Sequence, residues 1–116
     1  MFTSTNITLR LKYPCSMIYS TIINLSTFNK NYKLLNDSSY DCVQIHLNSK
    51  KRNLVNQTSG YCLYVFMENE ANETVKLGLY IPKAEYRKDP TLYLEAYKLI
   101  NQFTSDLQHS LKACNN

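Results

Sequence analysis

Two histidines, His46 and His109, are the residues best suited to acid–base chemistry near neutral pH. An enzyme of the secreted ribonuclease type would need both, together with a lysine that balances the charge of a phosphate. His46 falls on the polar side of a predicted strand, and His109 lies near the end of a predicted helix, where a cation suits the helix dipole. Surface placement therefore explains both. Because nucleophile-elbow, zinc-protease, phosphate-loop and paired-carboxylate motifs are all missing, we predict no catalytic residue, metal or cofactor.

The cysteines are the other residues with reactive side chains. Their number is even, they include no CxxC pair, and no histidine lies near them at metal-ligand spacing, so disulfides are favoured over a metal site. Disulfides in turn indicate an oxidising compartment. The four positions are Cys15, Cys42, Cys62 and Cys114.

Acceptor sites for N-linked glycans are more frequent than chance predicts. Five Asn-x-Ser/Thr sequons occur, where this composition predicts about two. A coding bias in a cytosolic protein is the alternative explanation. No apolar run approaches the roughly 20 residues that a membrane-spanning helix needs, and the first residues lack the pattern of a signal peptide. The sequons and the cysteines together predict a secreted protein, or the ectodomain of a membrane-anchored one. The predicted glycosylation sites are Asn6, Asn24, Asn36, Asn56 and Asn72.

Tyrosine is the most unusual feature of the composition, with ten copies and no tryptophan. Tyrosine offers a large rigid surface and a hydroxyl at small entropic cost, so binding surfaces favour it. Tyr93 and Tyr97 form an i, i+4 pair beside the apolar stripe of the C-terminal helix, and Tyr86 precedes that helix. These three tyrosines are the predicted protein-binding site, with ordinary amphipathic packing as the alternative.

The net charge of +4 is dispersed along the chain and is mainly a solubility feature. The one basic cluster, Lys50-Lys51-Arg52, is predicted to be a solvated loop that could make a weak contact with glycosaminoglycans. We expect no nucleic-acid partner. Only two glycines occur, Gly60 and Gly78, so glycine-built ligand loops are excluded.

The first third of the chain changes from a two-residue to a helical period. Residues 5–13 alternate apolar and polar side chains, the pattern of a half-buried strand. After Pro14, residues 16–29 place Ile18, Ile22 and Leu25 on one helical stripe, although the β-branched segment 21–23 leaves a strand as an alternative. If this segment is helical, Asn24 points away from the stripe.

The middle of the chain predicts three strands. Residues 40–48 alternate again, and the polar segment 48–60 reads as a loop. Residues 61–68 and 74–81 form a hairpin with a turn at 69–73, and the second strand places Val75, Leu77, Leu79 and Ile81 on one face.

The C-terminal segment predicts a long amphipathic helix over residues 90–113. Asp89 is a suitable N-cap, Pro90 suits the first helical position, and the apolar residues after it keep helical spacing. The stripe includes Leu92, Ala96, Leu99, Ile100, Phe103, Leu107, Leu111 and Cys114.

These elements predict one α+β domain over residues 1–116, in the order strand, helix, three strands, helix. An antiparallel sheet of about four strands is covered on one face by the C-terminal helix. Four cysteines allow three pairings, among which the sequence by itself does not decide. Cys42 and Cys62 sit near the starts of successive strands, whereas Cys15 ends the first strand and Cys114 lies on the buried stripe of the last helix. We therefore favour the pairs Cys42–Cys62 and Cys15–Cys114.

The expected function is non-enzymatic recognition of another extracellular protein, as an immune modulator, a ligand or an adhesion domain. The alternative is a small secreted basic hydrolase of the ribonuclease type that uses His46 and His109.

Overall fold

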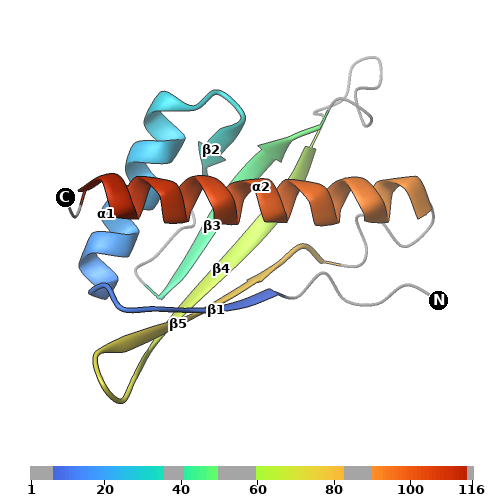
Figure 1. The fold of residues 1–116 in the computed structure, drawn as a ribbon. Helices are drawn as coiled ribbons and strands as arrows, with labels where there is room; N and C mark the ends of the chain where they lie inside the picture. The colour runs from blue at the N-terminus through green and yellow to red at the C-terminus, as the bar shows by residue number, and fades with distance from the viewer. Residues whose placement is uncertain (1–6, 36–40, 50–59, 83–89, 115–116) are drawn as a thin grey trace.

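An antiparallel sheet and two helices make up the computed structural model, which describes residues 7–35, 41–49, 60–82 and 90–114. The strands are β1 (Ile7–Leu11), β2 (Tyr32–Leu34), β3 (Cys42–Asn48), β4 (Gly60–Glu70) and β5 (Thr74–Tyr80). The helices are α1 (Cys15–Phe28) and α2 (Pro90–Cys114). The five strands are ordered β1-β5-β4-β3-β2 and every neighbouring pair is antiparallel. Both helices lie on the same face of this sheet, and α2 crosses the strands (Figure 1).

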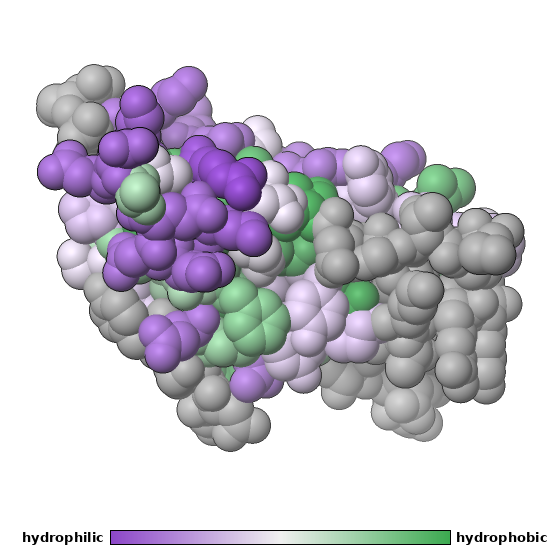
Figure 2. All heavy atoms as spheres, turned by 90° about the horizontal axis from the view of Figure 1, so that it is seen from below, coloured by the Kyte–Doolittle hydropathy of each residue, from purple (hydrophilic) through white to green (hydrophobic). Residues whose placement is uncertain are grey.

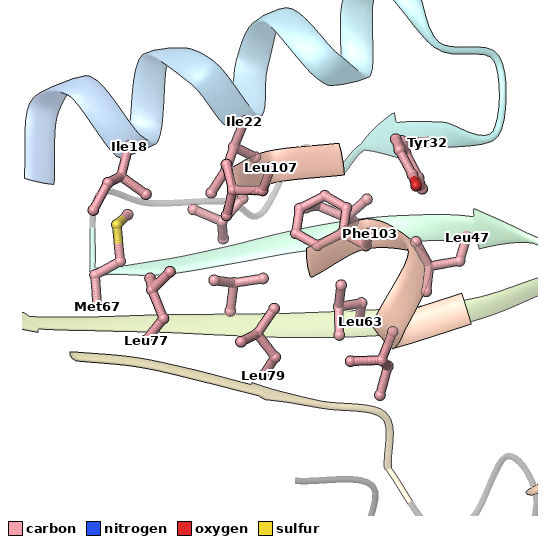
Figure 3. Packing of buried hydrophobic residues seen from close by; sticks show 14 of the residues in the cluster. Ile18, Ile22, Tyr32, Leu47, Leu63, Met67, Leu77, Leu79, Phe103 and Leu107 are labelled. Atoms are coloured by element: carbon pink, nitrogen blue, oxygen red, sulfur yellow. The ribbon is translucent and has the colours of Figure 1, made fainter. Parts of the chain in front are cut away.

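The hydrophobic core lies between that face and the two helices, as Figure 3 shows. Alternate residues of β3, β4 and β5 point into it, because side chains of a strand change face at every residue. From α2, residues spaced three and four apart enter the same space. The largest fully buried side chains include Ile45, Leu63, Leu77, Leu79, Ile100 and Phe103.

Residues 15–28 form a helix and not the alternative strand. Pro14 precedes the helix, and its carbonyl oxygen accepts hydrogen bonds from the amides of Met17 and Ile18. Ile18, Thr21 and Ile22 are buried, which is helical spacing and not the alternation of a strand. The buried Thr21 hydroxyl donates to the carbonyl oxygen of Met17 at 2.8 Å, so this β-branched residue fits inside the helix.

Two hydrogen-bonded clusters hold α2 in place on the sheet. Near its N-terminal end, Oε1 of Glu95 accepts from the Tyr61 hydroxyl at 2.8 Å and from the Ser49 hydroxyl at 2.5 Å. Near its C-terminal end, the Tyr32 hydroxyl donates to Asp106 at 2.5 Å, and the Tyr32 ring meets Phe103 edge to face. Tyr61 of β4 and Ser49 just after β3 therefore meet α2 at one point, and Tyr32 of β2 meets it at a second.

The strand β2 is an addition to the predicted topology, which expected three strands between the helices. Tyr32–Leu34 is too short for a two-residue period to be recognised in the sequence. Its strand conformation is defined by its hydrogen-bonded pairing with β3. The predicted N-cap Asp89 and most of the predicted loop 48–60 lie outside the described residues.

The predicted disulfide between Cys42 and Cys62 is wrong. Successive antiparallel strands start at opposite ends of a sheet, so two cysteines near strand starts are far apart. The register places Cys62 opposite His46 and Cys42 opposite Phe66. A displacement of four residues is about 14 Å along a strand, whereas disulfides need α-carbons within about 7 Å.

The predicted disulfide between Cys15 and Cys114 is wrong as well, because Cys15 is a free thiol, as are Cys42 and Cys62. Cys15 begins α1 and does not end β1, and its sulfur donates a hydrogen bond to Oδ1 of Asn69 at 3.3 Å, in the β4–β5 hairpin. The side chain of Cys114 lies outside the described set. Packing and hydrogen bonds, and not crosslinks, therefore hold the described part of the chain together.

The two glycines offer a matched test of the backbone. A β-carbon on Gly60, where φ is +152°, would overlap the carbonyl oxygen of Leu47 and lie 2.5 Å from ring atoms of His46. A β-carbon on Gly78 would meet no atom within 4 Å. We expect Gly60→Ala to lower the free energy of unfolding by more than about 1 kcal/mol and Gly78→Ala to raise it by about 0.4–1 kcal/mol. Urea unfolding measures both, and equal effects of the two substitutions would contradict the geometry at Gly60.

The hydrogen bond between Tyr32 and Asp106 predicts a pH-dependent contribution to stability. Burial, and then the Asp106 hydrogen bond and charge, raise the pKa of Tyr32 well above its usual value. The native state therefore keeps the phenol proton at a pH where the unfolded chain, with a pKa of about 10, releases it. Stability from this group is complete below pH 10 and is lost as the pH rises above 10.

Tyr32→Phe tests this contribution. At pH 7 the variant should be less stable by about 1.5 kcal/mol, at the low end for a bond to a charged group because Asp106 keeps Gln102 as a partner at 2.9 Å. The difference from the unsubstituted protein should shrink between pH 9 and pH 11, measured by urea unfolding. Tyr97→Phe, at an exposed tyrosine, is the control and should leave stability unchanged. A difference that stays constant with pH would contradict the assignment.

Candidate binding surfaces

The sheet has a second face, opposite the helices, which we call the open face. Its side chains are those that alternate with the core positions, and no helix of the described ranges lies on it (Figure 1). The central three strands contribute most of it, and β1 and β2 add an edge each. The open face consists of Thr8, Arg10, Lys33, Cys42, Gln44, His46, Cys62, Tyr64, Phe66, Glu68, Lys76, Gly78 and Tyr80.

Three aromatic rings stand next to one another on the open face, and we call them the aromatic row. Tyr80 lies between the other two, with its ring centroid 5.2 Å from that of Tyr64 and 5.8 Å from that of Phe66. The planes are nearly parallel, at 15° and 5°. Cross-strand pairing produces this arrangement, because Tyr64 is opposite Tyr80 and Phe66 is diagonal to it. Phe66 at the end of the row is 43% exposed.

A hollow lies beside the aromatic row. It has a volume of about 330 Å³, which is at the small end of the range for ligand pockets, roughly 300–1,000 Å³. Its lining includes Thr8, Phe66, Glu68, Lys76, Gly78 and Tyr80. Seen from the side of β1 and the β4–β5 hairpin, apolar, weakly polar and strongly polar side chains lie next to one another (Figure 2). The hollow itself is amphipathic, because Phe66 and Tyr80 line it together with Glu68 and Lys76.

Charges of both signs surround the hollow. Arg10 is paired with Glu70, with 3.0 Å between Nε and Oε1. Lys76 lies opposite Arg10 on one side and opposite Glu68 on the other. Two cations and two carboxylates leave this end of the open face close to neutral, so it is not a basic patch suited to phosphate.

The two histidines lie on opposite sides of the molecule. His46 is on the open face, opposite Cys62, with its ring over Gly60. His109 is exposed on α2 between the buried Leu107 and Leu111, on the far side of the sheet. The sheet and a helix separate them, so the structure does not bring together the pair that a ribonuclease-like site requires. Among the described residues, no group of three His, Cys, Asp or Glu side chains could hold a metal ion.

The predicted tyrosine site on α2 is described in part. Tyr93 and Tyr97 are neighbours, with ring centroids 6.3 Å apart and planes tilted by 34°. Tyr97 is 42% exposed, and Leu94 beside it is 55% exposed, whereas Tyr93 packs partly against the core. Tyr86 lies outside the described residues. The surface of α2 therefore presents a patch of Tyr93, Leu94 and Tyr97, of which sequence analysis had missed Leu94.

A third apolar surface lies between the helices. Phe28, the last residue of α1, is 84% exposed and borders a groove that Thr21 and Leu25 of α1 form with Ser110 and Ala113 of α2. Asn24 of a predicted sequon also lines this groove. Asn24 and Phe28 are four residues apart and so share a face of α1. A glycan on Asn24 would therefore lie at the groove.

The other predicted surface sites divide between described and undescribed residues. Asn24 is exposed on α1, and Asn72 is exposed in the β4–β5 turn, where its φ is 64°. Three sequon positions, Asn6, Asn36 and Asn56, lie outside the described residues. So does the predicted basic loop Lys50-Lys51-Arg52. No helix in the described ranges has the length and apolar character that crossing a bilayer requires.

Sequence analysis had missed the aromatic row, although one signal for it was present. Placing Val75, Leu77 and Leu79 on the core side leaves Gly78 and Tyr80 on the other side of the same strand. The missing information was the register that sets Tyr80 against Tyr64. A comparison with known protein families and with curated proteins finds no match for this chain.

Proposed function

We propose that this chain is a non-enzymatic domain of a secreted or cell-surface glycoprotein, and that it binds another protein. The observation that carries the proposal is the aromatic row on the open face of the sheet. Sheets that pack on one side normally present polar side chains to water on the other. Here the middle of the open face presents Tyr64, Tyr80 and Phe66 beside a hollow.

Aromatic side chains at the centre of a surface, surrounded by polar ones, are the usual arrangement of a protein-binding site. Phe66 is the most exposed member of the row, and its neighbours include the charged Lys76 and Glu68. A partner that covers Phe66 would remove apolar area from water at about 25 cal/mol per Å². The polar neighbours would then form the rim that orients the partner.

The α2 patch of Tyr93, Leu94 and Tyr97 is the second surface that supports a binding role. Its two exposed members lie three residues apart on one helix face, the spacing by which helices meet a partner. The open face offers three aromatic rings where the α2 patch has two, and it has a hollow beside them, so we place the principal site there and keep the α2 patch as the comparison surface.

The extracellular part of the proposal rests on the sequons, because Cys15, Cys42 and Cys62 are free thiols and supply no disulfide. Asn24 and Asn72 are exposed, as glycan acceptors must be. In protein recovered from its natural source, peptide mass mapping should find glycans on both asparagines, and glycosidase treatment should remove them. Unmodified Asn24 and Asn72 together with reduced cysteines would place the protein inside the cell and contradict this part.

The binding role is tested with the full chain and two matched surface variants. Immobilised protein is screened against a panel of purified extracellular proteins by surface plasmon resonance, alongside Phe66→Ser on the open face and Leu94→Ser on α2. Both side chains are exposed, so neither substitution should unfold the domain. We expect a saturable partner whose affinity falls about 5–30-fold in Phe66→Ser, the effect of losing about 1–2 kcal/mol, and is unchanged in Leu94→Ser.

The opposite pattern, loss in Leu94→Ser alone, would move the site to the α2 patch. If neither variant differs from the unsubstituted chain, both surfaces are excluded as the site. If no protein in a broad extracellular panel binds saturably, the binding role itself is contradicted.

A further inference from the structure

Gly78 is a glycine that the fold does not require. It lies inside β5, paired with Thr8 on one side and with Phe66 on the other, and both ladders run through it without a bulge. Its φ is not positive, and a β-carbon there would meet nothing within 4 Å. Glycine inside a strand is destabilising relative to alanine, so neither backbone conformation nor crowding explains its presence.

A common structural explanation is also excluded. A cross-strand aromatic side chain can lie over a strand glycine and replace the missing contacts. Phe66 is directly opposite Gly78, but its ring is stacked against Tyr80, and the space above the glycine is empty to 4 Å. With a bulge, a positive φ and aromatic cover all ruled out, close approach of another group to the backbone is the remaining role that strand glycines often have.

The space above Gly78 is the hollow on the open face, and its lining restricts what can enter. Phe66 and Tyr80 supply apolar ring surface, and Thr8, Lys76 and Glu68 supply donors and acceptors. Lys76 and Arg10 disfavour a cation, while Glu68 and Glu70 disfavour an anion. The occupant should therefore be neutral, flat enough to lie on the strand beside the rings, and polar at one end.

We propose that the hollow over Gly78 receives a tyrosine or tryptophan side chain of the protein partner. This inference rests on the proposed protein-binding function and names its anchor. The incoming ring continues the aromatic row, because offset-stacked or edge-to-face contacts with Phe66 and Tyr80 are favourable. Its hydroxyl or indole N–H meets the rim, where the Glu68 carboxylate accepts a hydrogen bond from either group and Lys76 donates one to a tyrosine hydroxyl. An aliphatic side chain would fill the space but leave those polar groups without a partner.

The test fills the hollow without damaging the fold. Gly78→Val adds a β-branched side chain, which suits a strand, into space that no atom occupies, so the melting temperature should stay the same or rise. Phe66→Leu removes the ring from the wall and keeps an apolar side chain. The full chain, labelled with ¹⁵N, is titrated with N-acetyl-tyrosine amide, N-acetyl-tryptophan amide and, as the non-aromatic control, N-acetyl-leucine amide.

We expect saturable shifts of the Thr8, Lys76 and Gly78 backbone amides with the two aromatic probes and not with the leucine probe. In Gly78→Val and Phe66→Leu those shifts of Thr8 and Lys76 should be lost. Equal shifts with the leucine probe, shifts that persist in Gly78→Val, or no shifts with any probe would overturn the proposal. The proposal would also be overturned if Gly78→Val changed the oligomeric state of the chain, because the hollow would then be occupied by a second copy of this chain.

The partner assay separates this proposal from the one that it rests on. If Gly78→Val binds the partner as tightly as the unsubstituted chain, the anchor is wrong while the binding role stands. If the unsubstituted chain binds the aromatic probes at Gly78 but no extracellular protein, the hollow is an aromatic-ligand site and the protein-binding role fails.

Discussion

The packing of α2 across one face of the sheet is the constraint on which the rest of the structure depends. The helix buries Ala96, Ile100, Phe103, Leu107 and Leu111 against the core side of β3, β4 and β5. Burial of this kind is the main favourable term in folding, and it commits alternate residues of each strand to one side. Because α1 joins α2 on that side, no helix in the described part of the chain covers the other face (Figure 1). The open face is thus a consequence of where the apolar stripe of α2 goes.

Polar contacts decide how α2 sits, although they contribute less to stability than the core does. Tyr61 and Ser49 meet at Glu95, and Tyr32 reaches Asp106 about three turns further along the helix. Directional hydrogen bonds at two separated points oppose rotation and sliding of a helix that apolar packing alone would tolerate in several positions. Each cluster also satisfies a tyrosine hydroxyl that would be costly to bury without a partner.

The same register both removes the expected crosslink and creates the candidate site. Pairing Cys62 with His46 carries Cys42 four residues away along the strand, so these thiols cannot join. Pairing Tyr64 with Tyr80, and Phe66 with Gly78, assembles three parallel rings next to an unfilled hollow. Cross-strand neighbours are far apart in sequence, which is why a pattern read along the chain cannot find them. A surface built in this way is held by the rigid centre of the sheet.

The sequence by itself determined the period of each main element. Alternation marked β1, β3 and β5, and the stripe around Phe103 marked α2, because burial on one side leaves a repeat that can be read locally. Its aromatic and β-branched composition marked β4. It also contained the unexplained Gly78 and the sequons of Asn24 and Asn72. Only the tertiary structure decided the short strand β2, the separation of His46 from His109, the free thiols and the aromatic row. Each of those depends on register or on which side of the sheet a helix covers, and both are set by long-range packing.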